Sequence, residues 1–300
     1  MKNISYMTIS AIFVVLIFMS SSVLATEGAP PSSGKARIDY LDNGTLYDYN
    51  IHHKRPAKAI PETFESRREK SIVENLSFSV YSNFPSRYVY QAMASSDGFV
   101  WQPSATIELY GVGFNVWGNF VLADIPDQGK FNEVDLTLYY NVKIWGLTIH
   151  PYMLFCLYPT DNKRSLDYSA YTDIKPSLHL AYSLGPIDIF TELAVYLHPN
   201  KGALILDMGL GFQHEIVKNF GIETSALIGL GNSRFNRSNF NVSETKINHF
   251  AYSLGFPWNA VKGLLIKPNA NVSAFFSQKL RNAVPYPVLV WGGVDLSYNF

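Results

Sequence analysis

The sequence of 300 residues is poor in cysteine and in charge. Cys156 is its only cysteine, so no disulfide can form within the chain. Lys and Arg number 24, as do Asp and Glu, and this balance gives no reason to expect a nucleic-acid partner. Only 16% of the residues are charged, whereas 15% are aromatic. This composition predicts an outer surface that does not mainly face water.

Long apolar runs are missing after residue 25, so no membrane-spanning helix is expected there. The mean hydropathy of +0.02 is also too low for a bundle of such helices. The start of the chain differs, because Lys2 precedes an apolar run and Val23-Leu24-Ala25 offers a cleavage site. We predict a signal peptide over 1–25 that is removed on export, with a membrane anchor helix as the alternative.

Residues 26–73 have a different composition from the rest of the chain. The first half is rich in Pro, Gly and Ser, and the second half is rich in charged residues. This predicts a flexible periplasmic segment, with one short helix near 62–73. His52-His53 could ligate a metal, but adjacent residues on such a segment rarely form a site.

From residue 74 onward, apolar residues recur with a period of two, which indicates β-strands. In NEVDLTLYYNVKI, Val134, Leu136 and Leu138 fall on one face, whereas Glu133 and Asp135 fall on the other. A tilted strand crosses a bilayer with roughly 9–11 residues. About twelve segments are predicted, most of them longer than this, near 75–82, 99–110, 112–123, 132–145, 147–158, 171–184, 187–198, 202–217, 220–231, 246–258, 263–277 and 288–300.

The predicted connections alternate in length, except that a short one at His198-Pro199-Asn200 falls where a long one is expected. Long polar loops separate the short turns, which are expected at Gly111, Trp145-Gly146, Gly185-Pro186, around Lys218-Asn219 and around Ala260-Val261. Aromatic residues near these turns predict an interfacial girdle on the periplasmic side: Tyr110, Trp145, Tyr182, Phe220, Trp258 and Phe300. Short turns on one rim and long loops on the other are typical of an outer-membrane barrel.

The predicted fold is therefore all-β: a transmembrane antiparallel β-barrel of about 12 strands over 74–300 in the bacterial outer membrane. The alternative is a periplasmic β-sandwich, whose strands would be shorter and whose outer faces would be polar.

The chain ends in VLVWGGVDLSYNF, a two-sided strand that is expected to pair with the first strand near Leu76–Tyr81. Closure removes the open edge, which lipid cannot satisfy with hydrogen bonds. The ending resembles the carboxy-terminal signature of bacterial outer-membrane proteins, with Tyr298 and a terminal Phe300. The resemblance implies recognition by the barrel assembly machinery.

Two further stretches resemble a Gram-negative family of unknown function that is predicted to form outer-membrane barrels. NFPSRYVYQAM is similar to an S-x-Y-x-F-R-G element, although Gln91 and Ala92 stand where Arg and Gly are expected. Glu133-Val134-Asp135-Leu136 resembles an E-[VI]-D-L element. The family implies the barrel fold and brings no established activity.

If apolar residues face lipid, polar residues line the lumen. The predicted lining includes Glu133, Asp135, Lys143, His150, Asp173, Lys175, His179, Glu192, Asp207, Lys267 and Asp295. Two-residue turns at Gly185-Pro186 and Trp145-Gly146 would pair particular residues across neighbouring strands. The pairs so predicted are Ser183 with Asp188, His179 with Glu192, Asp173 with His198, and Asn141 with His150.

Three functions are open to such a chain. The first is a narrow channel for small polar or charged solutes. The second is a non-conducting barrel whose internal charges are structural, acting as a scaffold or partner for periplasmic machinery through residues 26–73. The third, less favoured, is a lipid-modifying enzyme, for which no Gly-x-Ser-x-Gly occurs. We predict no catalytic, cofactor or metal site, an inert Cys156, and contact with outer-membrane lipid and lipopolysaccharide.

Overall fold

A computed structural model gives the positions of residues 75–123, 128–159 and 172–300. The predicted signal peptide, and the segment 26–73 with its short helix, lie outside these described residues. Within the described part of the chain, no helix is both long and apolar enough to cross a membrane.

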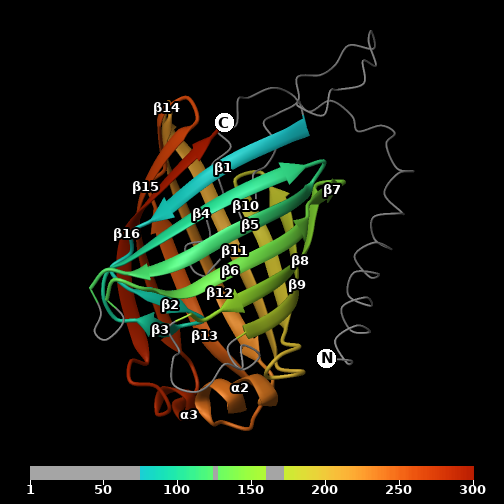
Figure 1. Ribbon diagram of the computed structural model, residues 1–300, viewed down its shortest axis with the longest axis vertical. Coiled ribbons are helices and arrows are strands. Elements are labelled where there is room, and N and C mark those ends of the chain that lie inside the picture. Colours follow the sequence, from blue (N-terminus) through green and yellow to red (C-terminus); the bar gives the residue numbers. More distant parts are fainter. Residues whose placement is uncertain (1–74, 124–127, 160–171) are drawn as a thin grey trace. The chain divides into compact units, whose positions relative to one another are not determined.

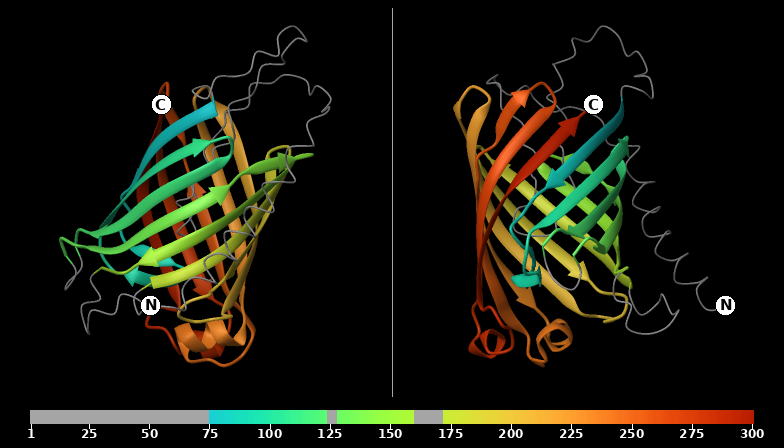
Figure 2. Two further views of the ribbon diagram at one scale, coloured as in Figure 1. Left: turned by 45° about the vertical axis from the view of Figure 1, so that its right-hand side comes forward. Right: turned by 60° about the vertical axis from the view of Figure 1, so that its left-hand side comes forward.

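Antiparallel strands close into one barrel (Figures 1 and 2). Its wall follows the order β1-β4-β5-β6-β8-β9-β10-β11-β12-β13-β15-β16, and β16 pairs back with β1. The short stretches β7 and β14 continue β6 and β13, so the 14 stretches of this sheet make a 12-strand barrel, as predicted. The wall strands are β1 (Leu76–Asn83), β4 (Val100–Leu109), β5 (Val112–Val121), β6 (Phe131–Tyr140), β7 (Val142–Ile144), β8 (Leu147–Leu157), β9 (Thr172–Leu184), β10 (Ile187–Val195), β11 (Leu204–Val217), β12 (Phe220–Gly231), β13 (Lys246–Gly255), β14 (Trp258–Val261), β15 (Leu264–Phe275) and β16 (Val288–Asn299).

Tight turns join the strands at one rim. Trp145 and Gly146 have φ values of 50° and 87°, and Ile144 pairs with Leu147 across them. Positive φ at both central residues is the type I′ geometry that matches the twist of a hairpin. One predicted turn position is wrong: the chain reverses at Lys262-Gly263, two residues beyond Ala260-Val261, because Gly263 supplies the positive φ.

The seam of the barrel lies between its first and last strands, as the sequence predicts. Ser79 pairs with Asn299, and the register continues to Asn83 and Asp295. Inside the barrel, the Tyr81 hydroxyl donates to Asp295 Oδ1 across the seam at 2.9 Å. Backbone and side-chain hydrogen bonds therefore both close the cylinder.

The long connections contain structure that the period of two does not reveal. The hairpin of β2 (Tyr88–Tyr90) and β3 (Met93–Ser96) lies between β1 and β4, α2 (Ser233–Phe240) follows β12, and α3 (Gln278–Arg281) follows β15. Asn232 caps α2, because its side chain accepts a hydrogen bond from the Phe235 backbone amide at 2.8 Å. All of these elements lie at the same end of the barrel in Figure 1.

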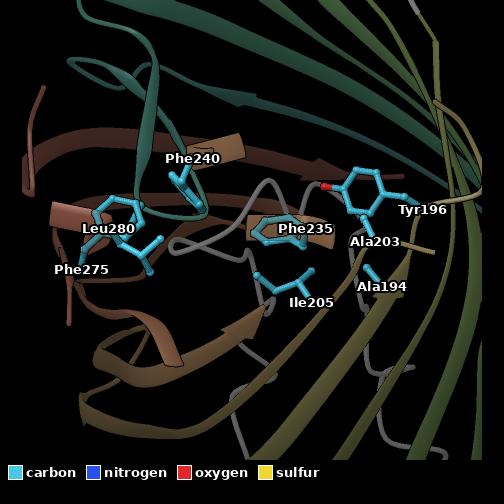
Figure 3. Packing of buried hydrophobic residues seen from close by; sticks show 9 residues of the cluster. Ala194, Tyr196, Ala203, Ile205, Phe235, Phe240, Phe275 and Leu280 are labelled. Atoms are coloured by element: carbon cyan, nitrogen blue, oxygen red, sulfur yellow. The ribbon is translucent and has the colours of Figure 1, made fainter. Parts of the chain in front are cut away.

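An apolar cluster lies at this loop end of the barrel (Figure 3). Phe235 and Phe240 of α2 and Leu280 of α3 meet inward-facing residues of the wall, including Ile205 and Phe275. Phe240 and Phe275 make an edge-to-face contact with ring centroids 5.2 Å apart. The helices thus attach to the barrel by burying aromatic surface over its mouth.

Candidate functional site: the polar interior of the barrel

The distribution of polar and apolar side chains is the reverse of that in a water-soluble protein. On the outer face, Leu138, Leu210 and Val290 are 45%, 55% and 67% exposed. On the inner face, His150 and Lys267 are fully buried. Hydrocarbon around the outside satisfies this arrangement, which is the architecture of bacterial outer-membrane barrels.

Most of the residues predicted to face inward are buried. They are Glu133, Asp135, His150, Lys175, His179, Glu192, Asp207, Lys267 and Asp295. Asp173 is partly buried at the start of β9, and Lys143 is exposed on β7 beside the turn rim. Cys156 is also buried on the inner face.

The predicted register is confirmed where the turn is tight. Ser183 pairs with Asp188, and His179 pairs with Glu192. The prediction for His198 is wrong, because it bridges Ile174 rather than Asp173. The ladder between β9 and β10 ends at Ser177 and Ala194, and beyond that point the pairing slips by one residue.

The second predicted hairpin turns at Trp145-Gly146. The pairs on either side of Asn141 and His150 have the register that places these two residues opposite each other. Tyr139 pairs with Tyr152, and Val142 pairs with Ile149.

A row of inner-wall residues, all but one of them ionisable, follows the backbone pairing from strand to strand. Each member is directly paired with the next across six neighbouring strands: His150, His179, Glu192, Asp207, Gly229 and His249. Glu192 accepts a hydrogen bond of 2.5 Å from the Tyr152 hydroxyl, and its other oxygen lies 3.8 Å from His179 Nδ1. The row gives one half of the wall a band of carboxylates and imidazoles.

Glycines on the inner face let side chains meet across an intervening strand. Gly229 lies between Asp207 and His249, whose Oδ1 and Nε2 atoms are 4.0 Å apart. Gly255 lies on β13, between the strands that carry Glu223 and Lys267. The Lys267 side chain passes over Gly255, and its Nζ atom lies 3.2 Å from Glu223 Oε1. The missing side chains therefore allow polar contacts between strands that are not neighbours.

Lys267 is the best-paired charge of the interior. Its ammonium lies 3.2 Å from Glu223 Oε1 and 3.3 Å from Asp295 Oδ2. Because an unpaired buried charge costs several kcal/mol, removing Lys267 would leave the buried carboxylate of Asp295 without its cation. This triad joins β12, β15 and β16 from the inside and contributes to the wall whether or not solute passes.

The β2–β3 hairpin lies inside the barrel and contacts its wall on several sides. Tyr88 packs against Trp117 of β5 with ring centroids 5.6 Å apart. The Tyr90 hydroxyl accepts a hydrogen bond from Lys175 Nζ of β9 at 3.4 Å, and the ammonium lies 4.9 Å from its ring centroid. Val89 packs against Leu289 and Trp291 of β16, completing contacts from three parts of the wall. The sequence places these residues in a long polar loop, so their inward position was not predicted.

Ion pairs tie the outer loops together beyond the strands. Glu244 accepts hydrogen bonds from Lys246 and Lys279, and these lower the pKa of its carboxyl to about 2. Arg87 and Asp97 form an ion pair of 3.1 Å, and a hydrogen bond to Asp97 raises the pKa of Tyr286. The loops that carry α3 and the β2–β3 hairpin are therefore linked above the barrel mouth.

Comparison with known proteins gives only distant likenesses. The KdgM porin has a TM-score of 0.45 and 10% identity over 74% of this chain and 99% of that one. The NanC porin has a TM-score of 0.43 and 9% identity over 74% and 100%. An outer membrane channel from Pseudomonas putida F1 has a TM-score of 0.44 and 9% identity over 81% and 100%. No family model matches the sequence, and no match was found among curated proteins.

Proposed function

We propose that the protein is a narrow channel of the bacterial outer membrane for small, polar, positively charged solutes. The observation that carries this proposal is the composition of the interior. Its buried carboxylates are Glu133, Asp135, Glu192, Asp207 and Asp295, whereas its buried lysines are Lys175 and Lys267. An acidic path through a low-dielectric wall concentrates cations and repels anions.

The β2–β3 hairpin makes the proposed path narrow. It brings Tyr88 to β5 and Tyr90 to β9, and the apolar cluster around Phe235 lies at the same end of the barrel. A barrel of eight strands is filled by its side chains, whereas one of 16–18 strands leaves a wide aqueous channel. With 12 strands and an inward hairpin, we expect conduction in small steps.

One observation favours a second candidate, the non-conducting barrel. His150 and Lys267 are fully buried, so their neighbours exclude water from them. In this alternative, the interior network only holds the wall together, and the protein acts as a scaffold or partner through residues 26–73. The two candidates differ in whether ions cross the folded protein.

Planar-bilayer recording of the purified, folded protein separates these candidates. We expect small steps that favour cations over anions. Glu192→Gln should reduce the cation preference because it removes a charge from the row, whereas Leu210→Ala on the outer face should leave the preference unchanged. The absence of steps from protein whose heat-dependent gel shift shows an intact barrel would remove the channel and favour the scaffold.

Two partner assignments belong to the same proposal. Tyr298 and Phe300 at the end of the closing strand are proposed to be read by the barrel assembly machinery. Lipid and lipopolysaccharide are proposed to surround the outer face, with the exposed aromatics Tyr110, Trp145 and Trp258 near the periplasmic interface. We assign no chemical reaction to the chain.

A further inference from the structure

Three potential metal ligands meet on the inner wall near the loop end of β6 and β8. Glu133, Asp135 and Cys156 each offer one ligand atom, and these atoms lie within 4.8 Å of one another. All three residues are buried. The fold explains their approach, because Glu133 and Asp135 are two residues apart on one strand and Cys156 pairs directly with Asp135 on the next.

A second observation concerns the carboxylate at the centre of this group. Asp135 is 4% exposed, and its carboxyl group forms a hydrogen bond with the Cys156 thiol, but its Oδ1 atom has no hydrogen-bond partner among the residues that the structure describes. A buried carboxylate oxygen without a donor is costly, and a bound cation would satisfy it.

The balance of charge around these three ligands also favours a bound cation. Asp173 pairs with Cys156 from β9, so carboxylates from two strands flank the thiol. Lys175 is close enough to interact electrostatically with Asp135 and Cys156, and supplies one positive charge. The carboxylates of Glu133, Asp135 and Asp173 thus outnumber the single ammonium of Lys175. This excess of negative charge favours the binding of a divalent cation.

We propose that Glu133, Asp135 and Cys156 bind one divalent transition-metal ion of the zinc class. A thiolate with two carboxylates suits a borderline-soft ion such as Zn²⁺ and disfavours Mg²⁺ and Ca²⁺, which prefer oxygen ligands alone. Binding exchanges one S–H bond for one S–metal bond, and the thiol proton passes to solvent. No electron is transferred. The site lies in the wall and does not depend on the channel being open.

Cadmium ions provide a direct probe, because a Cd²⁺–thiolate bond absorbs in the ultraviolet and Cys156 is the only cysteine. The full-length chain is refolded with and without Cd²⁺, so that burial does not limit access, and excess ion is then removed. We expect a charge-transfer band that saturates at one ion per chain, release of about one proton per ion, and loss of the band when Zn²⁺ competes.

Matched variants test the ligands separately. Asp135→Asn and Glu133→Gln should each weaken Cd²⁺ binding about tenfold or more, whereas Asp188→Asn, another inward carboxylate, should not. Cys156→Ser should abolish the band. If Cys156→Ser fails to fold, the two carboxylate variants still decide the matter. A folded wild-type protein without the band, or a band with unchanged affinity in both carboxylate variants, would overturn the site.

Discussion

Gly229 shows how one missing side chain can organise the interior. A Cβ atom at this position would lie 2.6 Å from Asp207 Oδ1 and would also collide with the His249 ring. At Gly211 on the adjacent strand, by contrast, the nearest atom to an added Cβ is Asp188 Cβ at 3.7 Å, an ordinary contact. A side chain at position 229 would therefore collide with its neighbours, whereas one at position 211 would not.

Replacement of these glycines by alanine should have unequal effects. Gly229→Ala should lower the free energy of unfolding by about 1–3 kcal/mol, because Asp207 and His249 must move apart in a packed interior. Gly211→Ala serves as the control and should change it by no more than about 0.5 kcal/mol. Urea unfolding in lipid vesicles, followed by tryptophan fluorescence, measures both. Equal losses in the two variants would show that the Asp207–His249 approach does not depend on Gly229.

For single residues, the sequence could predict the face of a strand on which a side chain lies, but not which residue it contacts on the next strand. The alternation of Glu133 and Asp135 with apolar residues predicts one shared face for both, because the period of a strand is fixed, and both residues are buried. It could not show that Cys156 would lie beside Asp135, since that depends on the register between β6 and β8. The prediction for His198 was wrong for the same reason, a slip of one residue at the end of a ladder.

Among the elements, the β2–β3 hairpin has the largest consequence for function. Its neighbours β1 and β4 pair directly with each other from Leu76 with Leu109 to Asn83 with Gln102, so the wall does not need the hairpin. Tyr88, Val89 and Tyr90 instead contact the wall from within. The hairpin can therefore be removed without breaking a ladder of the barrel.

Replacing residues 87–97 by a shorter Gly-Ser linker should raise the conductance step several-fold, because it removes the side chains that cross the bore. The same bilayer recording measures this, with Phe276→Ala on the outer surface as the control. Steps of unchanged size would place the constriction elsewhere, and the wild-type gel shift should persist in both variants.

Elements of the wall were predictable, whereas elements of the loops were not. Trp145-Gly146 and Gly185-Pro186 are strong local turn signals between alternating segments, and the structure has turns at both. α2 spans eight residues, and its stability depends on packing Phe235 and Phe240 into the barrel mouth. Isolated helices of this length are marginal, so a polar stretch gives little sign of one.

For the molecule as a whole, the closed wall and the outward-facing apolar side chains both suit a lipid environment. Pairing β16 with β1 leaves no open edge in the wall, and the outward apolar side chains then need no partner other than lipid. The composition already indicated this apolar outer surface through its few charges and many aromatics. How the loops would narrow the bore could not be read from composition, because it depends on contacts between distant segments such as Tyr90 and Lys175.

The central claim is that hydrocarbon surrounds the barrel and polar groups occupy its interior, and nitroxide accessibility at two consecutive residues tests it most directly. In a Cys156→Ser background, single cysteines replace Leu210, which is 55% exposed, and Gly211, which has room for a substituent. In lipid vesicles, the label at 210 should collide mainly with oxygen dissolved in the acyl chains, and the label at 211 mainly with a water-soluble nickel complex. Aqueous exposure at 210 together with acyl-chain contact at 211 would contradict the account.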